Sequence, residues 1–98
     1  MLLSEASKLY LNTKEQEGFS SYTINAYRIQ HSLLIRDIGD VPIHDVTLRL
    51  LRDHIQRESK HLKASSVAHK VRSIKSMFAW LLYEEYIEKK ALRNTVLK

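Results

Sequence analysis

Glycine and proline are scarce in this chain: its 98 residues include two glycines and one proline. Soluble proteins contain on average about 7% glycine and about 5% proline, and folds rich in tight turns rely on both. A fold of many short strands joined by turns is therefore disfavoured, and a helical fold is expected. The length fits one domain around one hydrophobic core, which excludes a multidomain enzyme.

Apolar residues recur at intervals of three and four in four segments, as on the buried side of amphipathic helices. These segments predict helices at residues 3–17, 21–38, 48–59 and 66–84. We therefore expect an all-α, compact four-helix domain, with the strongly periodic fourth helix at its centre. The inward side of the first helix is predicted to carry Leu3, Ala6, Leu9, Tyr10 and Thr13. The predicted core comprises Tyr10, Ile24, Tyr27, Leu34, Leu51, Ile55, Val71, Ile74, Phe78 and Leu81.

Helix ends are marked by residues that stop or cap a helix. They are Gly18 after the first helix, Gly39 after the second, and Ser20, Thr47 and Ser65 as N-caps of the second, third and fourth. The single proline predicts an extended link at residues 40–43, because proline disfavours helix in the residue before it. Beyond residue 86 the periodicity weakens, which predicts either a short additional helix or a linker.

The whole chain has a formal net charge of +5, and its basic residues are concentrated in the second half. No carboxylate occurs between residues 59 and 83, a stretch that holds Lys60, Lys63, Lys70, Arg72 and Lys75. Such a surplus indicates an anionic partner, and nucleic acid, an acidic protein or a membrane surface would each provide one. A solvated helix face without any partner is the alternative interpretation.

The fourth helix is expected to present a polar face opposite its apolar side. That face is formed by Ser65, His69, Arg72 and Ser76, with Lys70 and Lys75 on its two flanks. A small, polar and basic helix face suits the major groove of DNA, where such side chains contact base edges and phosphates. On the second helix, Ile29 and Leu33 are expected to face outward and to form an apolar patch.

Several kinds of chemistry are excluded or disfavoured. The chain has no cysteine, and its five histidines do not have the spacing of a zinc hydrolase. His31 is expected to be a hydrogen-bonded core histidine. No glycine-rich phosphate loop and no opposed pair of carboxylate clusters occur, so we expect no catalytic residue, no cofactor and no metal site. No apolar run approaches the about 20 residues of a membrane span, and a cytoplasmic location is expected.

Two stretches together resemble a known family. They are "GFSSYTINAYRIQ" at the start of the second helix and "KASSVAHKVRSIKSMFAWLLYEEYI" in the fourth. In order and spacing they resemble the N-terminal core-binding, SAM-like domain of tyrosine recombinases, the phage-integrase family. The family's Ser-x-x-Thr-[Leu/Ile]-x-x-Tyr and Phe-x-Trp-Leu patterns correspond to Ser20, Thr23, Ile24 and Tyr27, and to Phe78, Trp80 and Leu81. The resemblance covers about residues 3–90.

The resemblance implies a DNA-binding domain at residues 1–90, followed by the start of a linker at 91–98. The family's catalytic domain has no counterpart in the chain, so no enzymatic activity is expected of it. The implied partners are double-stranded DNA, a C-terminal catalytic domain of the same protein and other recombinase protomers. The implied DNA contacts are Ser20, Ser21, Thr23, Asn25, Arg28, Lys63, Ser65, Ser66, His69, Arg72, Lys75 and Ser76. The alternative function is a small helical protein-interaction module that uses the patch around Ile29 and Leu33.

Overall fold

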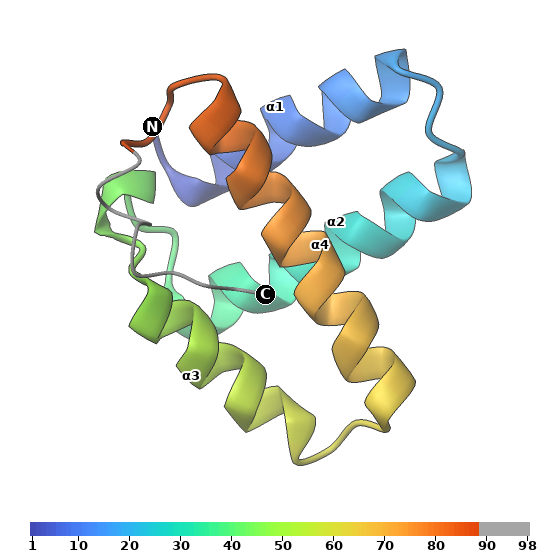
Figure 1. The fold of residues 1–98 in the computed structure, drawn as a ribbon, viewed down its shortest axis with the longest axis vertical. Helices are drawn as coiled ribbons and strands as arrows, with labels where there is room; N and C mark the ends of the chain where they lie inside the picture. Colours follow the sequence, from blue (N-terminus) through green and yellow to red (C-terminus); the bar gives the residue numbers. More distant parts are fainter. Residues whose placement is uncertain (89–98) are drawn as a thin grey trace.

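Four α-helices build the domain in the computed structural model, which describes residues 1–88 (Figure 1). They are α1 (Leu3–Gln16), α2 (Ser21–Ile38), α3 (Leu48–Ser59) and α4 (Ala64–Tyr83), with a 3₁₀ helix at Ile43–Asp45 between α2 and α3. Within the described residues no strand occurs apart from one isolated bridge, between Leu2 and Pro42. The predicted all-α, four-helix fold is therefore confirmed. The predicted domain end at residue 90, the linker at 91–98 and the possible extra helix lie outside the described residues.

Two of the three predicted N-caps are confirmed. The Ser20 hydroxyl accepts a hydrogen bond from the Thr23 N–H (3.1 Å), and the Thr47 hydroxyl accepts one from the Leu50 N–H (3.2 Å). The prediction for Ser65 is wrong, because α4 already begins at Ala64 with Lys63 at its N-cap position and no side-chain cap. A serine shortly before an apolar run fits an N-cap by pattern alone, but here the helix starts two residues earlier than predicted.

The link between α2 and α3 is tied to the start of the chain. The Leu3 N–H donates to the Val41 carbonyl (2.9 Å), and the side chain of Asp40 accepts from the Ser4 N–H (2.8 Å) and from the Ser4 hydroxyl (2.6 Å). The predicted extended link at residues 40–43 is only partly present: Asp40 forms a bend, Pro42 belongs to the isolated bridge with Leu2, and Ile43 begins the 3₁₀ helix, which the prediction did not include. Gly39 precedes the link with a φ of +92°, a conformation that favours glycine.

The core lies where α4 packs against the other three helices (Figure 1). Eight of the ten predicted core residues are buried, whereas Ile55 and Val71 are only partly buried. On α1, Leu11 is buried and Leu9 is 39% exposed, contrary to the prediction for Leu9. These differences arise because each helix is covered from a direction set by its neighbours, which the apolar arc of a single helix does not specify.

None of the helices in the described part of the chain is both long and apolar enough to span a membrane.

Candidate nucleic-acid interface

The proposed site residues on α2 lie at its start and divide into two groups. Ser20 and Thr23 serve the helix cap: the Ser20 hydroxyl also donates to the Thr23 hydroxyl (3.0 Å). Ser21, Asn25 and Arg28 are exposed and lie on the first two turns. The exposed three are therefore available to a partner, whereas the first two already stabilise the helix end, which needs hydrogen-bond acceptors for its unpaired N–H groups.

The proposed residues at and after the start of α4 differ in solvent exposure, although the sequence predicted that all of them would be exposed. Lys63, Ser65, Arg72 and Lys75 are exposed, whereas Ser66, His69 and Ser76 are partly buried. Among the described residues, neither Arg72 nor Lys75 has an acidic side chain within ion-pair distance. Within residues 1–88 both charges are therefore exposed to solvent.

The helical wheel predicted Ser76 to lie opposite the core, but Ser76 is partly buried in the structure. Its hydroxyl is hydrogen-bonded to the hydroxyl of Tyr10 on α1. Burial raises the pKa of Tyr10, with the Ser76 hydrogen bond acting in the opposite direction. Ser76 thus joins α4 to α1 and marks the edge of the exposed face.

A contact between Tyr27 and His69 brings the two sets of residues together. Their rings lie with centroids 5.8 Å apart and tilted by 53°, which joins the second turn of α2 to the second turn of α4. Figure 1 shows the two helices crossing, with the starts of both on the same side of the molecule. The exposed starts of α2 and α4 therefore flank one region of the surface.

A buried histidine holds this crossing in place. The Nε2–H of His31 donates to the Ser73 carbonyl on α4 (3.1 Å), and Nδ1 accepts from the Ser7 hydroxyl on α1 (2.8 Å). Burial lowers the pKa of His31 to about 4, so the ring is neutral near pH 7, in agreement with these hydrogen bonds. His31 is the hydrogen-bonded core histidine that the sequence predicted.

Lys70 is not part of this surface, although the sequence placed it on a flank of the polar face. Its side chain is fully buried, with Nζ 3.4 Å from Nε2 of His54 and 3.4 Å from Oε1 of Glu58. Burial of a lysine is rare unless the charge is paired, and periodicity alone gave no sign of these partners on α3. The basic face of α4 is therefore narrower than predicted.

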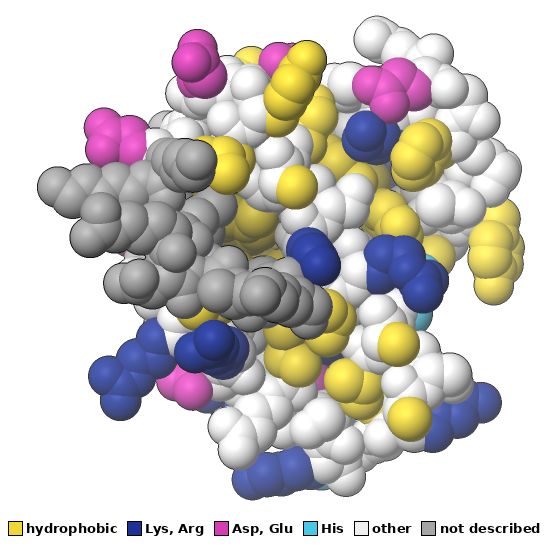
Figure 2. Space-filling view, viewed as in Figure 1, with side chains coloured by type: hydrophobic (Ala, Val, Ile, Leu, Met, Phe, Trp, Pro, Cys, Tyr) yellow, Lys and Arg dark blue, Asp and Glu magenta, His cyan; other side chains and the backbone are white. Residues whose placement is uncertain are grey.

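The face shown in Figure 2 separates the two signs of charge. Most dark-blue basic side chains lie over the middle and the lower part of this face, whereas most acidic side chains lie toward the upper end, near α1 and the end of α4. The carboxylate-free stretch of the sequence contributes the exposed cations Lys63, Arg72 and Lys75 to this surface, and such a surplus of positive charge would attract a polyanion.

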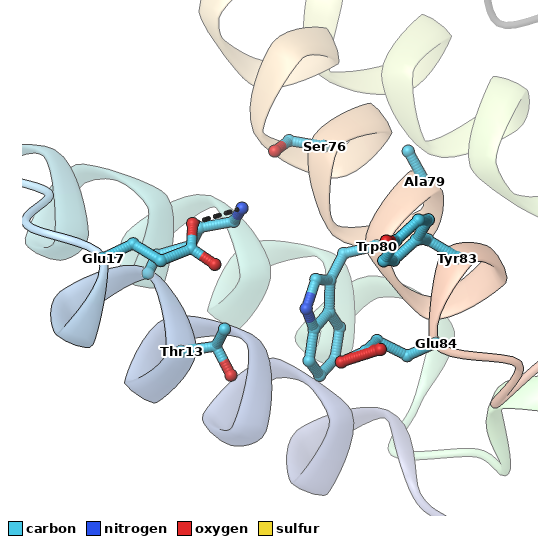
Figure 3. Close-up of a pocket in the computed structure, with 8 residues that line it drawn as sticks. Thr13, Glu17, Ser76, Ala79, Trp80, Tyr83 and Glu84 are labelled. Carbon is cyan, nitrogen blue, oxygen red and sulfur yellow. Dashed lines mark hydrogen bonds and ion pairs between the residues drawn. The ribbon is translucent and has the colours of Figure 1, made fainter.

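A groove of about 510 Å³ between α1 and the end of α4 limits this region. Figure 3 shows Glu17 and Glu84 bordering the groove on either side of the Trp80 ring. Glu17 forms an ion pair with Lys14 (3.0 Å), so that lysine is partly neutralised. A phosphate backbone would meet carboxylates here, and the candidate interface therefore ends near Ser76.

Two further observations concern the surface of α2. Ile29 is 50% exposed, but Leu33 is partly buried, so the predicted pair of outward-facing apolar residues is reduced to one. Tyr22 is 83% exposed on the first turn, beside Ser21, and was not among the predicted site residues. Its position two residues before the inward-facing Ile24 predicts an outward direction, which the structure confirms.

Within residues 1–88 no group of three or more histidine or carboxylate side chains lies close enough together to hold a metal ion.

Comparison of the chain with protein-family models, with curated proteins and with solved structures found no match.

Proposed function

We propose that this chain is the DNA-binding domain of a site-specific tyrosine recombinase, which grips a recombination half-site as one half of a clamp. The observation that carries the proposal is the exposed, carboxylate-free face of α4 with Arg72 and Lys75, beside the exposed start of α2. The resemblance of "GFSSYTINAYRIQ" and of the fourth-helix sequence to the core-binding domains of that family supplies the biological setting.

The width of an α-helix supports duplex DNA as the polyanion. An α-helix with its side chains is about 10–12 Å across, and the major groove of B-DNA is about 12 Å wide. On α4, Arg72 at the middle of the exposed face would reach base edges, while Lys63 and Lys75 would reach phosphates on either side. The start of α2 would add Asn25 and Arg28 from the same side of the molecule.

In this function the domain positions DNA and does not cut it. The reacting groups would belong to a catalytic domain encoded beyond Lys98, and DNA would lie between the two domains. This part of the proposal has a separate test: the reading frame should continue past Lys98 into a domain with the family's nucleophilic tyrosine, and a stop codon there would contradict it.

The salt dependence of DNA binding tests the interface. Each phosphate contact adds a slope of about −0.9 to a plot of log K against log salt concentration. Lys75→Ala should therefore make the slope shallower by about one unit, as measured by fluorescence anisotropy with a random duplex. Lys8→Ala is the matched control, because Lys8 is exposed on α1, away from the proposed face, and should leave the slope unchanged.

Equal slopes for the wild-type chain and Lys75→Ala would remove Lys75 from the interface. Binding that hardly depends on salt would instead favour an apolar contact, such as one through Ile29, and with it the protein-interaction function.

A further inference from the structure

Five charged or titratable side chains from α2, α3 and α4 form a continuous series of contacts. We name this series the α2–α3–α4 relay; it consists of Arg57, Asp37, His54, Lys70 and Glu58. Oδ2 of Asp37 accepts from Nη2 of Arg57 (2.8 Å) and from Nδ1 of His54 (2.7 Å). Nζ of Lys70 lies 3.4 Å from Nε2 of His54 and 3.4 Å from Oε1 of Glu58.

The partners of His54 define where its proton lies. An ionised carboxylate only accepts hydrogen bonds and an ammonium group only donates them. The hydrogen bonds from Arg57 and His54 lower the pKa of Asp37, so it is a carboxylate near pH 7. With Lys70 as an ammonium group, His54 must therefore be neutral, donating from Nδ1 to Asp37 and accepting at Nε2.

The relay is electrically balanced only in this state. Two carboxylates, Asp37 and Glu58, face two cations, Arg57 and Lys70, and both His54 and Lys70 are fully buried. A second proton on His54 would add one positive charge and turn Nε2 into a donor that points at another donor. Two like charges at this distance in a site without solvent repel strongly, so the contact between His54 and Lys70 must open.

These two residues also occupy a special place in the α3–α4 hairpin. His54 is the last buried residue of α3, and Lys70 is the first buried residue of α4. Every residue from 55 to 69 is exposed or partly buried, including the remainder of α3, the connecting turn and the first turns of α4. Ile55 packs against the core, Arg57 pairs with Asp37 and His69 contacts Tyr27, and the contact between His54 and Lys70 is the innermost of these anchors of the hairpin tip.

We propose that His54 is a proton-operated switch that holds the tip of the α3–α4 hairpin in place when neutral and releases it when protonated. The charged groups that act on His54 are Asp37 from α2, Lys70 from α4, and Arg57 and Glu58 through their contacts with those two. Proton binding separates Lys70 from His54, and residues 55–69 lose the buried anchors at their two ends. The switch stands whether or not α4 binds DNA.

Amide hydrogen exchange at about pH 8 and about pH 5, a range in which histidines titrate, tests the switch. The wild-type chain is compared with His54→Gln at each pH, because glutamine offers a neutral donor and acceptor at the same separation and cannot be protonated. Protection of the amides in residues 55–69 should be equal in both proteins at the higher pH. At the lower pH it should be about tenfold weaker in the wild-type chain, while amides of α1 remain alike.

Two more variants make the test independent of how well His54→Gln folds. Lys70→Met removes the contact with His54 at both pH values, so protection of residues 55–69 should already be weaker than in the wild-type chain at about pH 8. It should not weaken further at about pH 5, because protonated His54 then faces no ammonium group and keeps Asp37 as its partner. His44→Gln alters an exposed histidine and should behave as the wild-type chain. Equal protection of residues 55–69 in the wild-type chain and His54→Gln at both pH values would overturn the proposal, and so would a full response to acid in Lys70→Met.

Discussion

Lys70 and Lys75 lie on the same helix, yet one is inside the protein and the other in solvent. Lys70 is fixed by Glu58 and His54 from α3, whereas Lys75 has no acidic partner among the described residues. The inner face of α4 thus holds a charge that is paired within the fold, and the outer face holds exposed charges without an acidic partner among the described residues. The comparison teaches that a run of basic residues does not by itself define a basic surface.

The largest expected effect is the difference in unfolding free energy between variants of Lys70 and of Lys75. Lys70→Ala leaves the fully buried His54 and the partly exposed Glu58 without their partner, and should lower the free energy of unfolding by about 3 kcal/mol, the lower end of the range for breaking a buried ion pair. Lys75→Ala should change it by less than about 0.5 kcal/mol, as is usual for a surface substitution. Urea denaturation of both variants checks this. Equal losses of stability would abolish the distinction between the two faces.

A second prediction concerns His31, which joins α1, α2 and α4 behind the exposed face. Burial lowers its pKa from 6.5 in the unfolded chain to about 4, so between these values the unfolded chain binds a proton that the folded chain does not. The contribution of neutral His31 to the free energy of unfolding is fully present above about pH 6.5. It falls by about 3 kcal/mol as the pH is lowered to about 4. Chemical denaturation across this range measures it.

His31→Gln cannot bind the proton and should lack this part of the pH dependence, whereas the exposed His44→Gln should retain it. Parallel pH profiles for the wild-type chain and His31→Gln would mean that His31 is not kept neutral by the fold.

The outer face is tested by base discrimination. Arg72 lies at its middle, and a bidentate contact to guanine would contribute about 1–3 kcal/mol of preference at one base pair. Arg72→Ala should lose that preference between a duplex enriched by this chain from a random pool and the same duplex with one guanine replaced, as measured by anisotropy. Arg52→Ala, an exposed arginine on α3, is the control. Unchanged discrimination in Arg72→Ala would remove α4 from base recognition.

The smallest expected effect is the difference in stability between variants of Ser20 and Ser65, two serines that the sequence alone predicts to be N-caps. Ser20 caps α2, and its substitution by alanine should lower the free energy of unfolding by about 1 kcal/mol. Ser65 lies exposed inside α4 and caps nothing, so Ser65→Ala should stay within about 0.5 kcal/mol. Thermal or urea denaturation of both variants decides this, and a larger loss for Ser65→Ala would restore the predicted cap.

The elements of the fold were accessible from the sequence because they depend on local interactions. The four helices follow from apolar spacing, and their ends at Ser20, Gly39 and Thr47 follow from hydrogen bonds or backbone angles within a few residues. The burial of His31 could be predicted as well, because it falls in the middle of the apolar side of α2. The exposed members of the candidate site, Arg72 and Lys75, were identified for the same reason.

What only the tertiary structure decided is which side of each helix its neighbours cover. Lys70 is buried because α3 brings Glu58 and His54 to it, Ser76 is held by Tyr10 from α1, and Leu33 is partly covered although it lies away from the apolar arc of its own helix. Each of these outcomes depends on a partner distant in the sequence. Helical periodicity describes one helix at a time, whereas the energy of a buried charge depends on what other helices place beside it.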